Sequence, residues 1–122
     1  MYTGLIFKEG ISDFRIINDK EIKISKIEDW DIDDRAEDFQ PKKWTAIHIE
    51  GNEKNIEKVA RKISAALLPQ WYAKVSDKFA IFIIYHNKVF KSKKTRPRDV
   101  REAIAYGISI GIPEHQFDWL CD

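Results

Sequence analysis

Hydrophobic positions between residues 44 and 85 switch from the period of a strand to that of a helix and back again. Residues 44–50 alternate with period two, which is typical of a strand with two different faces. One face carries Thr45, Ile47 and Ile49, and the other carries Trp44, Ala46, His48 and Glu50. Residues 52–68 then follow the period of an amphipathic helix, and Pro69 ends it. We expect this helix to pack on the Ile47 face.

Extended segments follow the helix. Residues 71–75 and 79–85 are rich in β-branched and aromatic side chains, and 79–85 is apolar on both faces, which favours the sheet interior. A helical crossover between residues 45–49 and 71–75 would make these two strands parallel. After a short turn at residues 86–88, residues 89–91 are expected to return as the second arm of a hairpin.

The rest of the chain is less regular. Residues 2–7 predict a strand, whereas residues 11–18 fit a short helix or a strand equally well. Residues 21–30 predict a long strand whose alternation slips before Ile27, as at a β-bulge. A second helix is expected to begin near Arg96, and Gly111 fits its end.

These elements predict an α+β fold: a mixed β-sheet with two helices packed on one face, in a single domain over residues 1–122. With 43% hydrophobic and 34% charged residues, the composition argues against global disorder. With a net charge of +1, the chain as a whole has no strong electrostatic attraction to nucleic acid or to a membrane. A single Cys121 and the absence of a signal-like N-terminus make the cytoplasm the expected compartment.

Charge is unevenly distributed despite the balanced total. Residues 28–38 carry seven acids and one base, and we interpret residues 31–43 as a long acidic loop. The spacing of Asp29, Asp31 and Asp33 suggests a calcium loop, but that motif needs Gly at position 34 and Glu at position 40. The sequence has Asp34 and Gln40 there. We therefore expect a solvated loop, with no metal site and no cofactor.

Residues 88–101 carry seven bases and one acid. Because helix N-termini attract anions, this run is a candidate anion-binding segment. Its candidate residues are Lys88, Lys91, Lys93, Lys94, Arg96, Arg98 and Arg101. It contains no glycine-rich phosphate loop and no RNA-binding aromatic signature, so it also fits a solvated surface or a surface that faces the acidic loop.

His48 is the histidine with the most interesting neighbours. It shares a strand face with Trp44 and Glu50, and if the helices cover the other face, this one could receive a ligand or a partner. The alternative is a half-buried strand histidine whose nitrogens are bonded nearby. The four tryptophans predict mainly packing, with one or two at an interface.

Four segments, residues 41–46, 69–73, 88–90 and 106–119, combine spaced aromatic residues with a Gly-Ile-Pro-Glu motif. They resemble a family of small uncharacterised prokaryotic proteins over about two-thirds of the chain. The resemblance implies a compact α+β domain and carries no catalytic signature.

These observations favour a non-enzymatic protein-interaction module that self-associates through the aromatic sheet face or a sheet edge. The expected partner is a second copy, as a homodimer, or another protein, and not a membrane. The alternative is a binder of phosphate or nucleic acid through residues 88–101. A third hypothesis is a small enzyme built around His48 and Glu50.

Overall fold

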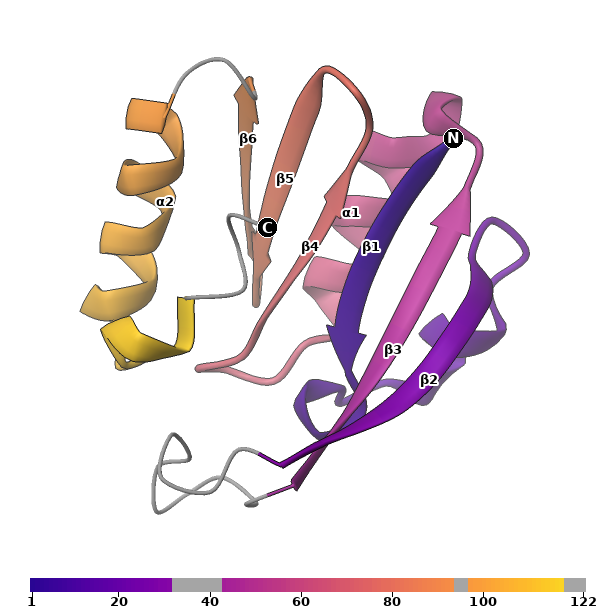
Figure 1. The fold of residues 1–122 in the computed structure, drawn as a ribbon, viewed down its shortest axis with the longest axis horizontal. Helices are drawn as coiled ribbons and strands as arrows, with labels where there is room; N and C mark the ends of the chain where they lie inside the picture. The colour runs from indigo at the N-terminus through magenta and orange to yellow at the C-terminus, as the bar shows by residue number, and fades with distance from the viewer. Residues whose placement is uncertain (32–42, 94–96, 118–122) are drawn as a thin grey trace.

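The computed structural model describes residues 1–31, 43–93 and 97–117, which form a six-stranded sheet and two α-helices (Figure 1). The strands are β1 (Tyr2–Phe7), β2 (Lys23–Asp31), β3 (Lys43–Gly51), β4 (Tyr72–Ser76), β5 (Ala80–Tyr85) and β6 (Lys88–Lys93). The helices are α1 (Ile56–Ala66) and α2 (Pro97–Ser109), with short 3₁₀ turns η1 (Lys8–Gly10), η2 (Phe14–Asn18), η4 (Glu53–Asn55) and η5 (Glu114–Phe117). The predicted α+β class is confirmed.

The described sheet is antiparallel throughout, in the order β2-β3-β1-β4-β5-β6, so the predicted mixed sheet is wrong. β3 and β4 do run in the same direction, but β1 lies between them and pairs with both. Alternation in a sequence shows which residues share a face, and it does not identify the neighbouring strand. The N-terminal strand therefore occupies the place where a direct β3–β4 pair was expected.

The two helices pack on opposite faces of the sheet, so the prediction that both lie on one face is also wrong. Phe82 and Ile84 of β5 belong to a cluster of buried residues with α1. Ile83 and Tyr85 of the same strand belong to a second cluster with α2. The physical reason is that an interior strand with two apolar faces needs cover on both. Neither helix in the described ranges is long and apolar enough to cross a membrane.

Local sequence explains several boundaries. The slip predicted in residues 21–30 is confirmed as a register shift between Ile24 and Lys26. The ambiguous segment 11–18 contains the 3₁₀ turn η2, where the Asp13 side chain accepts a hydrogen bond from the backbone N–H of Arg15 at 3.1 Å. Gly111 follows α2 with a φ of 104°, a left-handed conformation that suits glycine at a helix end.

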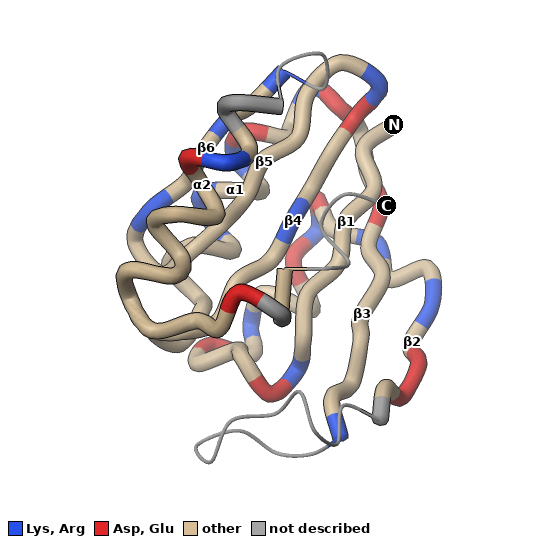
Figure 2. The backbone as a smooth tube through the Cα atoms, turned by 60° about the vertical axis from the view of Figure 1, so that its left-hand side comes forward, with Lys and Arg blue, Asp and Glu red and all other residues tan. Residues whose placement is uncertain are grey.

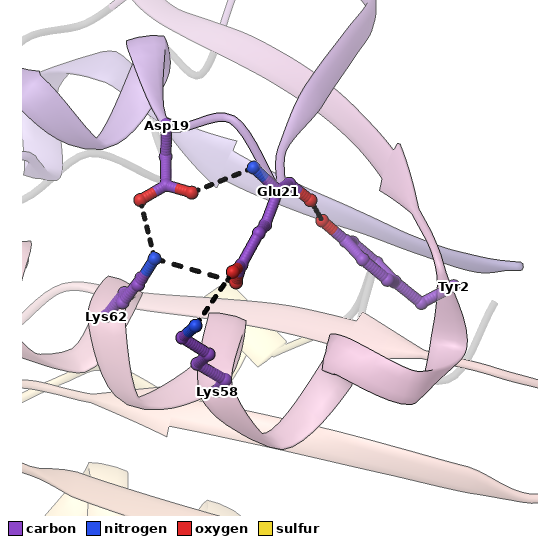
Figure 3. A network of polar contacts seen from close by, with 5 residues as sticks. All are labelled: Tyr2, Asp19, Glu21, Lys58 and Lys62. Carbon is purple, nitrogen blue, oxygen red and sulfur yellow. Dashed lines mark hydrogen bonds and ion pairs between the residues drawn. The ribbon is translucent and has the colours of Figure 1, made fainter.

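Polar side chains tie the start of β2 to α1 (Figure 3). The Lys58 Nζ donates to Glu21 Oε1 at 2.8 Å, and the Lys62 Nζ donates to Asp19 Oδ2 at 2.9 Å. These hydrogen bonds lower the pKa values of both carboxyl groups. The Tyr2 hydroxyl donates to the Glu21 carbonyl oxygen at 2.7 Å, and burial raises the pKa of Tyr2 to about 12. This network holds the chain in place where β2 begins.

Candidate functional site

The α2 side of the sheet is covered unevenly. α2 packs mainly on β5 and β6, at one end of that side. At the other end, β1 to β4 carry a mixed face of buried aromatic and apolar residues and partly exposed polar ones, which we name the His48 face. From the strand registers, its residues are Thr3, Leu5, Phe7, Lys23, Lys26, Glu28, Trp30, Trp44, Ala46, His48, Glu50, Lys74 and Ser76.

Near the β2 edge of the His48 face lies a pair that joins β3 to β2. His48 Nε2 is 2.6 Å from Glu28 Oε1, and about a third of each side chain is exposed. Hydrogen bonds from His48, then Trp30 and Lys26, lower the pKa of Glu28 from 4.5 to about 2. Glu28 therefore stays ionised at neutral pH and fixes the orientation of the imidazole ring.

Sequence reasoning missed Glu28 as the partner of His48. It placed Glu28 in the acidic run and grouped His48 with Glu50 instead. Glu50 does lie on the same face, but its carboxylate is 3.7 Å from the ammonium of Lys23. Glu28 could be found only from the β2–β3 register, in which Lys26 lies opposite His48 after the bulge.

Trp44 shares the face with His48, as its alternation predicts, but only 4% of the residue is exposed. Its ring lies among those of Phe7, Trp30 and Trp71, with centroids 4.9 Å from Phe7 and 4.9 Å from Trp71. A side chain buried this deeply packs the sheet and offers little surface to a partner. Within the predicted partner face, contact would therefore fall to His48 and Glu50.

A hollow of about 370 Å³ adjoins the histidine. Its lining includes Leu5, Trp30, His48, Lys74 and Ser76. An oriented histidine beside a hollow is the arrangement that general-base chemistry requires. Within the described ranges, however, no hydrogen bond joins the imidazole of His48 to a serine, threonine or cysteine side chain. In the part of the chain that the structure describes, the pair thus has an orienting carboxylate but no activated nucleophile.

β2 forms one edge of the sheet and borders the His48 face. Ile27 points to the α1 side, beyond the helix, and 59% of it is exposed. Lys23, Lys26 and Asp29 are exposed around it. Figure 2 shows a basic segment of β2 and, farther along the strand, an acidic one. This edge was not among the predicted site residues, although it follows from the place of β2 in the sheet.

The predicted anion-binding residues do not share one surface. β6 places Lys91 and Lys93 on the α1 side, and Lys88 on the opposite side, where its Nζ lies 5.4 Å from the centroid of the Phe90 ring. The Lys91 Nζ donates to Glu57 Oε1 at 2.9 Å. Arg101 is exposed on α2. Lys94, Arg96 and the side chain of Arg98 lie outside the described residues.

Lys91 and Lys93 line a hollow together with two residues that the sequence analysis did not identify as candidates. Lys78 and Phe79, in the turn between β4 and β5, line a hollow of about 490 Å³ with them, and 71% of Phe79 is exposed. A lysine-flanked aromatic ring suits an anionic partner. Glu57 and Asp77 also line this hollow, so its charge is mixed.

The remaining candidate residues are those of the acidic loop, the other two histidines and possible metal ligands. Residues 32–42, which hold most of the predicted acidic loop, and the side chain of His115 lie outside the described residues. His86 Nδ1 lies 2.7 Å from the Leu67 carbonyl oxygen. Among the residues that the structure describes, no cluster of three or more histidine, cysteine or acidic side chains could hold a metal ion.

Comparisons with protein-family models, with curated proteins and with solved structures found no match. The resemblance to small prokaryotic proteins therefore stays a prediction.

Proposed function

We propose that this chain is a small cytoplasmic protein-interaction module without enzymatic activity, and that it self-associates through the end of the sheet formed by β2. The observation that carries the proposal is the edge strand itself. β2 is nine residues long, lies at the end of the sheet order, and carries the exposed Ile27. Backbone N–H and C=O groups at such an edge can pair with a strand of another chain.

The edge supports this proposal better than the centre of the face does. The aromatic rings of the His48 face are engaged with one another, and Trp44 is buried. The hydrogen bond between His48 and Glu28 fastens β2 to β3. We assign this pair a positioning role, in which it keeps the edge strand in a fixed register.

The test is the mass of the purified protein, measured by light scattering over a wide range of concentrations. We expect the mass to rise from that of one chain to that of two. A monomeric mass at every concentration would overturn the proposal.

An Ile27→Lys variant localises the contact. It replaces the exposed apolar residue at the edge with a charge, so we expect association to weaken. Phe79→Lys is the matched control, since Phe79 is also an exposed hydrophobic residue but lies in the turn between β4 and β5. Equal weakening by both variants would argue against the β2 edge.

The second candidate function is anion or nucleic-acid binding, favoured by the grouping of Lys78, Lys91 and Lys93 around Phe79. Binding of a fluorescent single-stranded oligonucleotide would then fall steeply with salt, because phosphate contacts release counterions. Lys93→Glu should weaken this binding more than Lys20→Glu, an equal charge change at an exposed site on a different segment. Equal effects would indicate general electrostatic attraction only.

A further inference from the structure

The exposed edge of β2 is complementary to itself. Lys26 and Glu28 lie on the same face of the sheet, on either side of Ile27. In the same strand, the Lys26 Nζ lies 3.3 Å from the Glu28 carboxylate. Opposite charges two residues apart on one face can pair with the same residues of a strand that runs in the opposite direction.

We propose that two copies join through their β2 strands, antiparallel, about a two-fold axis that passes through Ile27. This inference rests on the proposed self-association and names its surface and register. Lys26 of each copy then faces Glu28 of the other, and the two Ile27 side chains face each other. The two six-stranded sheets become one continuous sheet.

Charge selects this register among the available ones. Side chains opposite each other in an antiparallel ladder point to the same face of the sheet. A two-fold axis midway between two residues would pair side chains that point to opposite faces, so the axis must pass through a residue. An axis through Lys26, Glu28 or Asp29 places each of these side chains opposite its own copy, and like charges then repel. An axis through Trp30 places Asp29 opposite Asp31. Of the axes through residues 26 to 30, the one through Ile27 alone avoids juxtaposing like charges.

The other edge of the sheet differs in this respect. β6 carries three lysines and no acid, so two β6 strands repel each other. Pairing of β2 with β6 of another copy would bring opposite charges together, but it would leave a free edge at each end. Such a contact builds open-ended filaments, whereas pairing of two β2 strands closes at two copies.

The bulge between Ile24 and Lys26 limits the contact. A bulge disrupts the ladder locally and increases the twist of the strand. Positions 26, 27 and 28 form the regular centre of the proposed ladder, and the bulge lies just beyond it on either side. We therefore expect a weak dimer whose mass depends on protein concentration, with the charge pairs setting the register.

Cysteine cross-linking tests the axis directly. In a Cys121→Ser background, Ile27→Cys places the two introduced thiols opposite each other, where Cα atoms lie about 4.5–5.5 Å apart and a disulfide fits. Mild oxidation with glutathione should therefore give a covalent dimer. Asp29→Cys is the matched control, because its two copies would lie roughly 13 Å apart along the strands. It should not cross-link.

A charge exchange tests the pairs by a second route. Lys26→Glu turns two attractive contacts into two repulsive ones, so we expect the dimer to dissociate about tenfold more readily. Glu28→Lys should act in the same direction, and the double variant should restore association to within about threefold of the original. Because Glu28 also bonds to His48, thermal unfolding is used to check that these variants fold.

The outcomes separate the two proposals. A monomeric wild-type chain overturns both. A dimer in which Ile27→Cys does not cross-link, or in which Asp29→Cys cross-links equally well, overturns the axis but leaves self-association standing. A mass that keeps growing with concentration overturns the closed pairing in favour of an open-ended one.

Discussion

The two faces of the sheet are stabilised by different kinds of packing. On the α1 side, mostly aliphatic strand residues such as Ile47 and Val75 meet Val59 and Ile63 of the helix in one buried cluster. On the other side, aromatic rings form two separate groups, one with α2 and one beyond it. On the α1 side, α1 and its ion pairs cover the sheet near the start of β2, and a hollow of about 490 Å³ remains between the start of α1, β5 and β6. On the α2 side, the hollow lies beside the His48–Glu28 pair and close to the β2 edge, where we propose the contact between copies.

Of the predicted variants, Trp44→Ala should lower the stability of the fold most. Removal of a buried tryptophan ring leaves a cavity among Phe7, Trp30 and Trp71, and we expect the free energy of unfolding to fall by about 3–5 kcal/mol. Urea denaturation measures the loss, and Phe79→Ala serves as an exposed aromatic control with little expected effect. Unchanged stability with lost self-association would instead make Trp44 a contact residue.

Gly107→Ala tests how closely α2 packs. An added Cβ at this position would come within 2.6 Å of the Tyr85 hydroxyl and would also press on the Phe117 ring. Overpacking costs about 1–3 kcal/mol, whereas alanine gains about 1 kcal/mol over glycine in helix propensity. We expect a net destabilisation of about 1 kcal/mol, with hydrogen-exchange protection lost first in α2.

Ala105→Leu provides the control for this variant, because Ala105 is exposed on the same helix. Its effect should stay within about 0.5 kcal/mol. An equal loss in both variants would point to the helix itself and not to its contact with Tyr85.

Acid should weaken the α1 side through Asp19 and Glu21. Lysine hydrogen bonds lower the pKa values of both carboxyl groups in the folded state, so they stabilise the fold above their ordinary pKa values. This contribution is lost as the pH falls through the lowered values. We expect the melting temperature to fall below about pH 5, and the fall to be shallower in Lys62→Met, which removes a partner of both groups. An identical pH profile in the variant would show that other carboxylates dominate.

Much of the fold could be predicted because it depends on local patterns. The period-two alternation at residues 44–50 identified β3, and the slip in residues 21–30 marked the β2 bulge. The position of α2 was predicted wrongly, because both helices were expected on one face, whereas the two apolar faces of β5 need cover on both sides. The insertion of β1 between β3 and β4 could not be predicted, because strand order depends on contacts far apart in the sequence.

The candidate site was less predictable than the fold for the same reason. His48, Trp44 and Glu50 do share a face, as alternation requires, but burial removed Trp44 from the surface. The link to Glu28 depends on a bulge that shifts the register of a distant strand. Similarly, alternation along β6 places Lys88 on one side of the sheet and Lys91 on the other, although a single basic run had predicted one surface.

His48→Ala should have the smallest effect on stability, and its main effect should be on the pKa of Glu28. The hydrogen bond from His48 is the largest cause of the lowered Glu28 pKa, and both side chains are partly exposed. We expect the pKa of Glu28, measured by carboxyl ¹³C NMR, to rise from about 2 toward its ordinary value of 4.5. The stabilisation from ionised Glu28, which in the wild type is lost only between about pH 4.5 and pH 2, would then be lost nearer pH 4.5. A pKa that stays low would mean that Trp30 and Lys26 suffice to hold the carboxylate, and that β2 keeps its place beside β3 without the histidine.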